Sequence, residues 1–288
     1  MNTGVTIYDE RPCLLGEGAL WHPLRMQLFW FDILAGKLLS RRGDQEFAWE
    51  FGECVSAAGW VDENRLIIAS ETQLFLFDVE SGERKHLAPL EADVPGTRSN
   101  DGRADPKGGF WIGTMGKKAE EGRGAIYRFH EGRVEPLFGG ITIPNAICFA
   151  PDGSRAYFAD THEDIVYTVK LDAEGWPEGD REVFLDLSAE GLHPDGAVVD
   201  ANGCFWNAQW GASRVARYSR EGKLEHVIAL PPTNTSCLAF GGLDFRTLYV
   251  TSARQDLEEP RLADGLVYVV PEAGKGVPEP AVMIEAER

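Results

Sequence analysis

The chain has 288 residues, 43% of them hydrophobic, and a formal net charge of −18 from 28 basic and 46 acidic residues. This length allows one large core without disulfides or structural metals, and the acidic excess disfavours binding to nucleic acid or to anionic membrane surfaces. No apolar run approaches the about 20 residues that span a bilayer, and no signal-peptide pattern is present at the start. The five cysteines include no CxxC pair, so we expect free thiols and a cytoplasmic protein.

Short apolar segments follow one another along the chain, each bounded by glycine, proline, aspartate or asparagine. In chain order they include LFWF (28–31), RLIIAS (65–70), FWIGT (110–114), AYFAD (156–160), CFWNA (204–208) and LYVTS (248–252). Such runs between turn residues are typical of β-strands, and apolar residues at helical spacing are not sustained anywhere. We therefore predict an all-β chain.

The turns between these strands recur at intervals of roughly forty to fifty residues, which is the repeat length of a β-propeller blade. They lie near Pro23, Asp62, Pro106, Pro151, Ala201 and Gly242. Six such units fill the chain, so we predict a single domain over residues 1–288 with six blades of four strands around a central channel. The last blade is expected to take one strand from the other end of the chain, which closes the ring and removes open sheet edges.

Aligning the units places one polar residue shortly before the turn in each of them. These residues are Glu17, Ser56, Asn100, Asn145, Asp195 and Ser236. Because the innermost strands of a propeller line its channel, we expect the six side chains to converge around one axis. All six offer oxygen donors, which favour Ca²⁺, Mg²⁺ or Mn²⁺ over softer metals.

This ring has a metal-binding interpretation and a structural one. Without a cation, Glu17 and Asp195 would repel each other in a partly desolvated channel. A metal site is therefore favoured for Glu17, Asn145 and Asp195 as a set. Polar residues at strand starts also cap turns and bond backbone groups, and that explanation is favoured for the two serines and for Asn100 taken alone.

Other residues near the ring also have two interpretations. Arg98 can present a planar set of donors to substrate oxygens, or it can form a surface salt bridge. His193 can line the channel mouth, although a loop histidine without such a role is the simpler explanation. Asp160 either supports the site or caps a turn. Trp206 and Trp210 can wall a pocket, but we expect them to be buried packing residues.

Four segments resemble the gluconolactonase, regucalcin (senescence marker protein) and luciferin-regenerating enzyme family. They are LGEGALWHP (15–23), RSNDGRADPKGGFWIGTM (98–115), IPNAICFAPDGSRAYFADT (143–161) and HPDGAVVDANGCFW (193–206). The resemblance implies a six-bladed propeller with one divalent cation in its channel, commonly Ca²⁺ or Zn²⁺, and hydrolysis of sugar lactones. It implies Glu17, Asn145 and Asp195 as metal ligands, and Arg98 and Asn100 as substrate contacts.

One position departs from the pattern of the animal members of this family. In those members, the stretch after the Thr-Met dipeptide supplies an acidic substrate contact. Here Thr114-Met115 is followed by Gly116-Lys117-Lys118, so Lys118 stands where the acid would be. A lysine donates hydrogen bonds to sugar hydroxyls but cannot accept them. We therefore assign Lys118 to the substrate without transferring the substrate preference of the animal members.

These observations together predict a metal-dependent hydrolase that opens aldonolactones to aldonic acids, with a small-molecule sugar lactone as its partner. The cation, Ca²⁺ first and Zn²⁺, Mg²⁺ or Mn²⁺ as alternatives, would polarise the lactone carbonyl. Asp195 is the expected general base for the attacking water, and activation of that water by the cation is the alternative. No GxSxG turn accompanies a Ser-His-Asp arrangement, which disfavours a covalent serine route.

Three other functions fit parts of the same pattern. A calcium-dependent phosphotriesterase-like hydrolase would use the same fold and oxygen ligands. A calcium-binding regulatory protein would need the metal but no turnover. A protein-interaction propeller of the WD-repeat kind predicts apolar or basic patches on one face and no channel carboxylates. The sequence leaves open the sugar, its ring size, the physiological metal and the oligomeric state.

Overall fold

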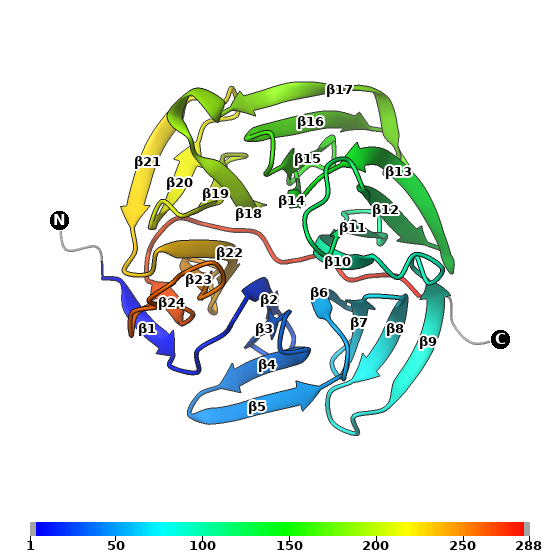
Figure 1. Ribbon diagram of the computed structural model, residues 1–288, viewed down its shortest axis with the longest axis horizontal. Coiled ribbons are helices and arrows are strands. Elements are labelled where there is room, and N and C mark those ends of the chain that lie inside the picture. Colours follow the sequence, from blue (N-terminus) through cyan, green and yellow to red (C-terminus); the bar gives the residue numbers. More distant parts are fainter. Residues whose placement is uncertain (1–3, 285–288) are drawn as a thin grey trace.

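A computed structural model describes residues 4–284 as an all-β ring of six antiparallel four-stranded sheets, arranged like the blades of a propeller (Figure 1). Within these residues the only helical element is a single 3₁₀ turn, Ser188–Glu190. The prediction of six blades of four strands is confirmed. No helix in the described part of the chain is long and apolar enough to cross a membrane.

The blades follow one another around the ring, and each begins with the strand nearest the axis. The first five blades are β2 (Gly16–His22), β3 (Gln27–Asp32), β4 (Lys37–Arg42) and β5 (Gln45–Glu50); β6 (Val55–Trp60), β7 (Arg65–Ser70), β8 (Gln73–Asp78) and β9 (Arg84–Pro89); β10 (Thr97–Ala104), β11 (Phe110–Gly116), β12 (Gly124–His130) and β13 (Arg133–Ile141); β14 (Pro144–Phe149), β15 (Arg155–Asp160), β16 (Ile165–Leu171) and β17 (Pro177–Asp186); β18 (His193–Val199), β19 (Phe205–Trp210), β20 (Arg214–Tyr218) and β21 (Leu224–Ala229).

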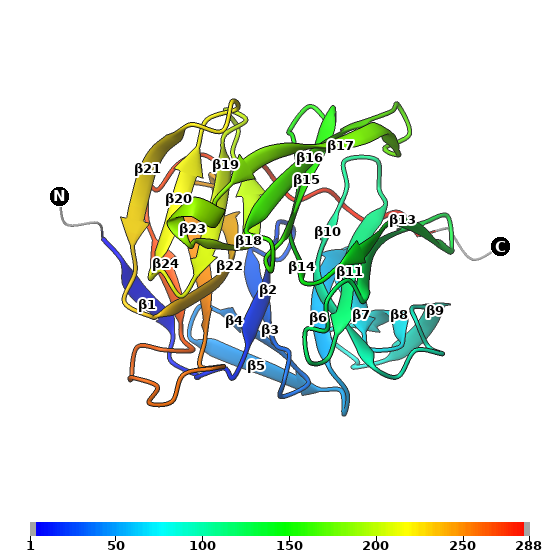
Figure 2. The ribbon, with the colours of Figure 1, turned by 45° about the horizontal axis from the view of Figure 1, so that its top comes forward.

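The sixth blade closes the ring with strands from both ends of the chain. It contains β22 (Asn234–Gly241), β23 (Thr247–Ala253) and β24 (Val267–Val270), and its outer strand is β1 (Thr6–Asp9). Thr6 pairs with Val269 in an antiparallel ladder, and Figure 2 shows β1 beside β24. The expected exchange of a strand between the two ends is confirmed, and it protects the edge that β24 would otherwise expose.

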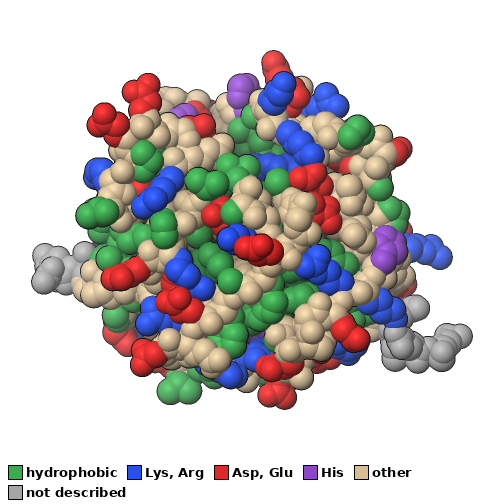
Figure 3. Space-filling view, turned by 60° about the horizontal axis from the view of Figure 1, so that its bottom comes forward, with side chains coloured by type: hydrophobic (Ala, Val, Ile, Leu, Met, Phe, Trp, Pro, Cys, Tyr) green, Lys and Arg blue, Asp and Glu red, His purple; other side chains and the backbone are tan. Residues whose placement is uncertain are grey.

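Apolar side chains fill the space between neighbouring blades. Phe29 and Phe31 of the first blade share one buried cluster with Leu66 and Ile68 of the second. Inner strands lie between two such layers, which explains why the whole of β3 is buried instead of alternating between buried and exposed residues. On the face shown in Figure 3, acidic and basic side chains are interleaved across the surface.

Two of the turns that follow an innermost strand are each capped by a buried aspartate. Between β10 and β11, Asp105 Oδ1 accepts hydrogen bonds from the backbone nitrogens of Lys107 (2.7 Å) and Gly109 (3.1 Å). Between β18 and β19, Asp200 plays the same part, and its Oδ2 also accepts from Trp206 Nε1 at 3.0 Å. These are side-chain-capped turns. The expectation that Trp206 is a buried packing residue is confirmed.

The segment after β24, residues 271–284, crosses one end of the channel (Figure 1). The backbone nitrogen of Ala201 in the fifth blade donates to Lys275 O at 2.7 Å, and the nitrogen of Val282 donates to Trp60 O in the second blade at 2.8 Å. We call this segment the strap, and the end of the channel that it crosses the strapped end. The opposite end, where the innermost strands begin, is the open end.

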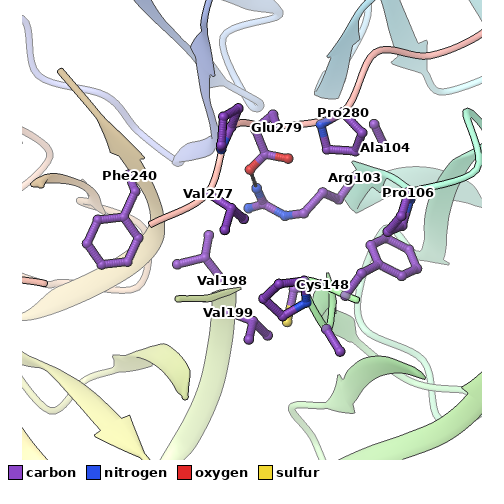
Figure 4. Close-up of a pocket in the computed structure, with 14 residues that line it drawn as sticks. Arg103, Ala104, Pro106, Cys148, Val198, Val199, Phe240, Val277, Glu279 and Pro280 are labelled. Atoms are coloured by element: carbon purple, nitrogen blue, oxygen red, sulfur yellow. Dashed lines mark hydrogen bonds and ion pairs between the residues drawn. The ribbon is translucent and has the colours of Figure 1, made fainter. Parts of the chain in front are cut away.

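A buried ion pair lies beneath the strap. Arg103 at the end of β10 pairs with Glu279 of the strap, and its Nε donates to Ile147 O at 3.1 Å. Figure 4 shows the two charged groups meeting at the centre of a cavity of about 210 Å³, with Val198 and Val277 beside them. Arg103 therefore joins the third blade, the fourth blade and the strap.

Candidate active site at the open end of the channel

All six channel-lining strands carry the same irregularity near the open end. In β2 the register shifts between Glu17 and Leu20, so that one extra residue lies in this strand. The other five shifts lie at Val55/Ala57, Ser99/Gly102, Asn145/Cys148, Pro194/Ala197 and Thr235/Leu238. An extra residue of this kind is a β-bulge, which bends the strand and re-aims side chains. The bulges thereby present polar side chains to the channel.

The ring residues do not all occupy equivalent ladder positions. Glu17 and Asn145 each form the last ladder pair before the bulge, and Gly18 follows with φ of 58°, a left-handed conformation that glycine adopts without strain. Asn100 and Asp195 lie inside the bulge, one position further along. The sequence alignment treated these positions as equivalent, whereas in the ladders Glu17 and Asn145 lie one residue earlier than Asn100 and Asp195.

Two buried carboxyl groups face each other in the channel. The side chains of Glu17 and Asp195 are hydrogen-bonded to one another, and the residues are 6% and 4% exposed. Burial, with repulsion from Asp101, raises the pKa of Glu17 to about 8. Burial and repulsion from Glu17 also raise the pKa of Asp195 well above its ordinary value. Without a cation the pair therefore retains a proton near neutral pH.

A chain of carboxamides in the same cavity lining links the third and fourth blades. Asn100 Nδ2 donates to Asn145 Oδ1 at 2.9 Å and to Pro144 O at 3.0 Å. Asn145 Nδ2 donates in turn to Thr161 Oγ1 at 2.8 Å. These bonds fix the orientation of both amides, so that the Asn145 oxygen faces Asn100 and the channel side of the site.

Arg98 belongs to the site and is not a surface salt bridge. Arg98 is 7% exposed, and its Nη1 donates to Ser99 O and to Asn100 Oδ1, both at 2.8 Å. Burial lowers the pKa of Arg98, while the charges of nearby groups, Glu17 among them, act in the opposite direction. The guanidinium is therefore a fixed positive charge beside the acidic pair.

The two serines of the ring brace neighbouring blades. Ser56 Oγ donates to Ser99 Oγ at 2.7 Å, which joins the second and third blades. Ser236 Oγ donates to Gly16 O, which joins the sixth blade to the first. These hydrogen bonds support the structural explanation favoured for both serines.

These groups open into a cavity of about 350 Å³ that is lined by Glu17, Arg98, Asn100, Asn145 and Asp195 at depth. Its wall also includes His193 and Trp210. His193 Nδ1 lies 2.6 Å from Asp164 Oδ1, so it is more than a loop histidine without contacts. Trp210 is only half-buried and lines the cavity, which corrects the expectation of a buried packing residue.

Two of the remaining sequence assignments have a clear place in the structure. Asp160 accepts from the backbone nitrogens of Thr142 (2.7 Å) and Ile143 (3.0 Å), so it caps the turn before β14. Lys118 is exposed, and its neighbour Ala119 lines the cavity in its place. A substrate contact by Lys118 stays a prediction from the sequence.

Among the residues at or below the cavity that the sequence analysis missed are one buried acid and two polar residues of a distant loop. Asp101 is a third buried carboxyl: its oxygens accept from the backbone nitrogens of Gly102 (2.9 Å) and Ile147 (2.8 Å). Burial raises its pKa, against the attraction of Arg103. Gln255 and Asp256 reach the cavity from the loop between β23 and β24. The Asn-Asp pair at 100–101 was a usable signal for Asp101, whereas the distant loop offered none.

The donor set fits a divalent cation. Glu17, Asn145 and Asp195 offer only oxygen atoms to it, and a cation would relieve the repulsion that now forces the two carboxyls to share a proton. Within residues 4–284, no group of three or more His, Cys, Asp or Glu side chains is arranged to hold a metal ion. The expected ligand set contains two carboxylates and one carboxamide, so only two of its three members are among those four residue types.

Fold and site together define a propeller with an acidic small-molecule cavity at one end of its channel. The chain belongs to the SMP-30/gluconolactonase/LRE-like family, whose sequence profile matches residues 15–254. A Rhizobium meliloti protein provisionally named sugar lactone lactonase is 43% identical over 93% of this chain and 90% of its own length. L-arabinolactonase of Azospirillum brasilense is 36% identical over 90% and 87%.

Solved structures agree with this assignment. A calcium-binding protein of Agrobacterium tumefaciens, regucalcin, superimposes with a TM-score of 0.94 at 40% identity and covers 96% of each chain. A luciferin-regenerating enzyme superimposes with a TM-score of 0.90 over 98% of this chain and 99% of its own. Its identity of 23% supports the fold alone.

Proposed function

We propose that this protein is a metal-dependent sugar lactonase that opens aldonolactones to aldonic acids. The observation that carries the proposal is the hydrogen-bonded pair of Glu17 and Asp195, buried in a cavity beside the fixed charge of Arg98. The names of the relatives support the reaction class, since several that align over most of this chain are lactonases.

Glu17, Asn145 and Asp195 are the residues that would hold the cation, with Ca²⁺ as the first candidate and Zn²⁺, Mg²⁺ or Mn²⁺ as alternatives. Once bound, it would supply a positive charge that stabilises the oxyanion developing from the lactone carbonyl. The name of the Agrobacterium relative, a calcium-binding protein, supports Ca²⁺. The all-oxygen donor set supports a hard cation on independent grounds.

The protein side chains have separate tasks in the ring opening. Arg98 and Asn100 orient the lactone through hydrogen bonds to its oxygens. Asp195 accepts a proton from the water whose oxygen attacks the carbonyl carbon. The ring C–O bond then breaks, and the leaving ring oxygen takes up the proton, so that the product is an aldonic acid. Because Asp195 is also a proposed ligand, a bound cation would weaken it as a base, and activation of the attacking water by that cation is the alternative to this role.

The other candidate functions differ in testable ways. A calcium-binding protein without activity would use the same three ligands, so metal binding alone does not separate it from a lactonase. A phosphotriesterase would turn over phosphotriesters in preference to lactones.

The five cysteines are all free, which supports our placement of the enzyme in the reducing cytoplasm.

The first experiment is a pH-indicator assay of chelator-treated protein with γ- and δ-aldonolactones. Ca²⁺, Mg²⁺, Mn²⁺ and Zn²⁺ are added back one at a time, and paraoxon serves as the phosphotriester comparison. Acid release that depends on added cation supports the lactonase and ranks both sugars and metals. If folded, metal-loaded protein releases no acid from any lactone, the proposal is wrong.

A further inference from the structure

The loop between β23 and β24 forms one side of the cavity mouth. It runs from Arg254 to Leu266, and Gln255 and Asp256 line the cavity. Glu17 and Asp195 are the other carboxyls in the lining, and they lie buried at its depth. Asp256 is exposed at the mouth, so it is the acidic group that a bound molecule meets away from the reacting centre.

Hydrogen bonds hold this part of the loop in place. The backbone nitrogens of Arg254 and Gln255 both donate to Leu14 O, at 3.0 and 2.9 Å, and Asn234 Nδ2 donates to Gln255 O at 2.9 Å. Asp256 itself has φ of 61°, a left-handed conformation that aspartate and asparagine tolerate better than most residues. The backbone position from which its side chain extends is therefore fixed by the loop.

Asp256 has free hydrogen-bonding capacity that faces the cavity. Gln255 Nε2 donates to its Oδ2 at 3.2 Å, and a carboxylate has further lone pairs to offer. Trp210, also in the cavity wall, packs against the cluster that contains Leu15 and Ala253. Trp210 and Asp256 both line the cavity, so a bound molecule meets an aromatic surface as well as a hydrogen-bond acceptor.

The loop between β23 and β24 supplies the cavity with a side chain that accepts hydrogen bonds, whereas Lys118 of the β11–β12 loop can only donate them. Lys118 is exposed outside the cavity, and the carboxylate of Glu120 accepts from the Lys118 backbone nitrogen at 3.1 Å. Arg98, on the other side of the site, is a donor. A sugar lactone carries several hydroxyl groups that can donate hydrogen bonds. An acceptor at the cavity mouth is needed to receive a bond from one of them.

We propose that Asp256 is a specificity residue that accepts a hydrogen bond from a sugar hydroxyl remote from the lactone carbonyl. Its negative charge also disfavours anionic ligands, and the reaction converts a neutral lactone into an aldonate anion. Asp256 therefore favours binding of the substrate over binding of the product. This inference rests on the proposed lactonase function and adds to it the residue that selects among lactones.

The test compares Asp256→Asn with Glu258→Gln. Asparagine keeps the left-handed backbone conformation accessible but loses the charge, and Glu258 is an exposed acid of the same loop that does not line the cavity. The KM and kcat of both variants are measured on the best wild-type lactone and on analogues that each lack one hydroxyl. Inhibition by the matching aldonate is measured at low and high salt.

We expect Asp256→Asn to raise KM by about fivefold or more, with a smaller change in kcat. This effect should disappear for the one analogue that lacks the contacted hydroxyl. The ratio of the aldonate inhibition constant to the lactone KM should fall by about twofold or more at low salt. Glu258→Gln should behave like the wild type in all of these measurements.

The outcomes separate the two proposals. If the wild-type enzyme opens no lactone, the proposed function is wrong and this inference falls with it. If the wild type is active but Asp256→Asn leaves KM unchanged, only the inference on Asp256 is wrong. The same holds if Glu258→Gln produces an equal shift, or if every analogue loses binding to the same extent, because the effect would then be one of general charge or loop structure.

Discussion

The two ends of the channel differ in how their buried charges are compensated. At the strapped end, Arg103 and Glu279 neutralise each other across the axis. At the open end, Glu17 and Asp195 are like charges that face each other and must share a proton. The same strands connect the two ends, over only a few residues at about 3.3 Å per residue. The charges at the strapped end compensate each other, whereas the two carboxyls at the open end repel each other.

The connection between the two ends passes through Asp101. Its negative charge raises the pKa of Glu17 and Asp195 above it, and Arg103 below it attracts the same carboxylate. The open end of the channel therefore holds three buried acids, Glu17, Asp101 and Asp195, against the positive charge of Arg98, whereas the strapped end pairs Arg103 with Glu279. The excess of negative charge lies toward the cavity, where a positively charged ligand can reach it.

The largest expected effect concerns the open end. Asp195→Asn removes the proposed base while nearly conserving the shape of the side chain, and we expect kcat to fall by about 10³-fold or more. Turnover at saturating metal is the measurement, with metal content and the thermal melt recorded on the same sample. Wild-type turnover in a variant that still binds metal would show that Asp195 is not the base.

A substitution at the strapped end should change the stability of the protein and not its catalysis. Glu279→Gln leaves the buried charge of Arg103 uncompensated, so we expect a loss of about 3–5 kcal/mol in the free energy of unfolding. Denaturant titration measures it. Glu272→Gln is the matched control, because Glu272 forms an exposed ion pair with Arg246 and should cost less than about 1 kcal/mol. Equal losses in both variants would contradict the contrast between buried and exposed pairs.

The metal-free open end should make stability depend on pH. The pKa of Glu17 is about 8 in the folded chain, and in the unfolded chain it returns to its ordinary value of about 4.3. Between these values the folded state binds more protons, so the free energy of unfolding falls as pH rises. The melting temperature in chelator should therefore decrease from about pH 5 to about pH 8.

A bound cation should remove this dependence, because the carboxylates are then stabilised in their charged form. Glu17→Gln in chelator should have a flatter profile than the wild type over the same range. The melting temperature of all three samples is measured against pH. A melting temperature in chelator that rises toward pH 8 would show that the acidic pair is not destabilising.

Residues that repeat in the sequence were predictable, and residues that depend on loop placement were not. The turn period predicted the six blades, and the polar ring predicted that Glu17, Asn100, Asn145 and Asp195 would line one cavity. The one-residue offset within the ring escaped notice because a β-bulge leaves no mark in the spacing of a single unit. Asp256 escaped because nothing in its local sequence indicates which end of the channel its loop approaches.

The smallest expected effect concerns Ser56 and distinguishes a structural residue of the polar ring from a proposed metal ligand. Ser56→Ala removes a hydroxyl that bonds Ser99 between two blades, so we expect a loss of about 0.5–1.5 kcal/mol in the free energy of unfolding. Metal affinity, measured by calorimetry, should remain unchanged. Asn145→Ala is the comparison, since it removes a proposed ligand and should weaken metal binding far more than it changes stability. If Ser56→Ala weakened metal binding as strongly, the serine would belong to the ligand set, and the open end would hold its cation through more of the ring than three residues.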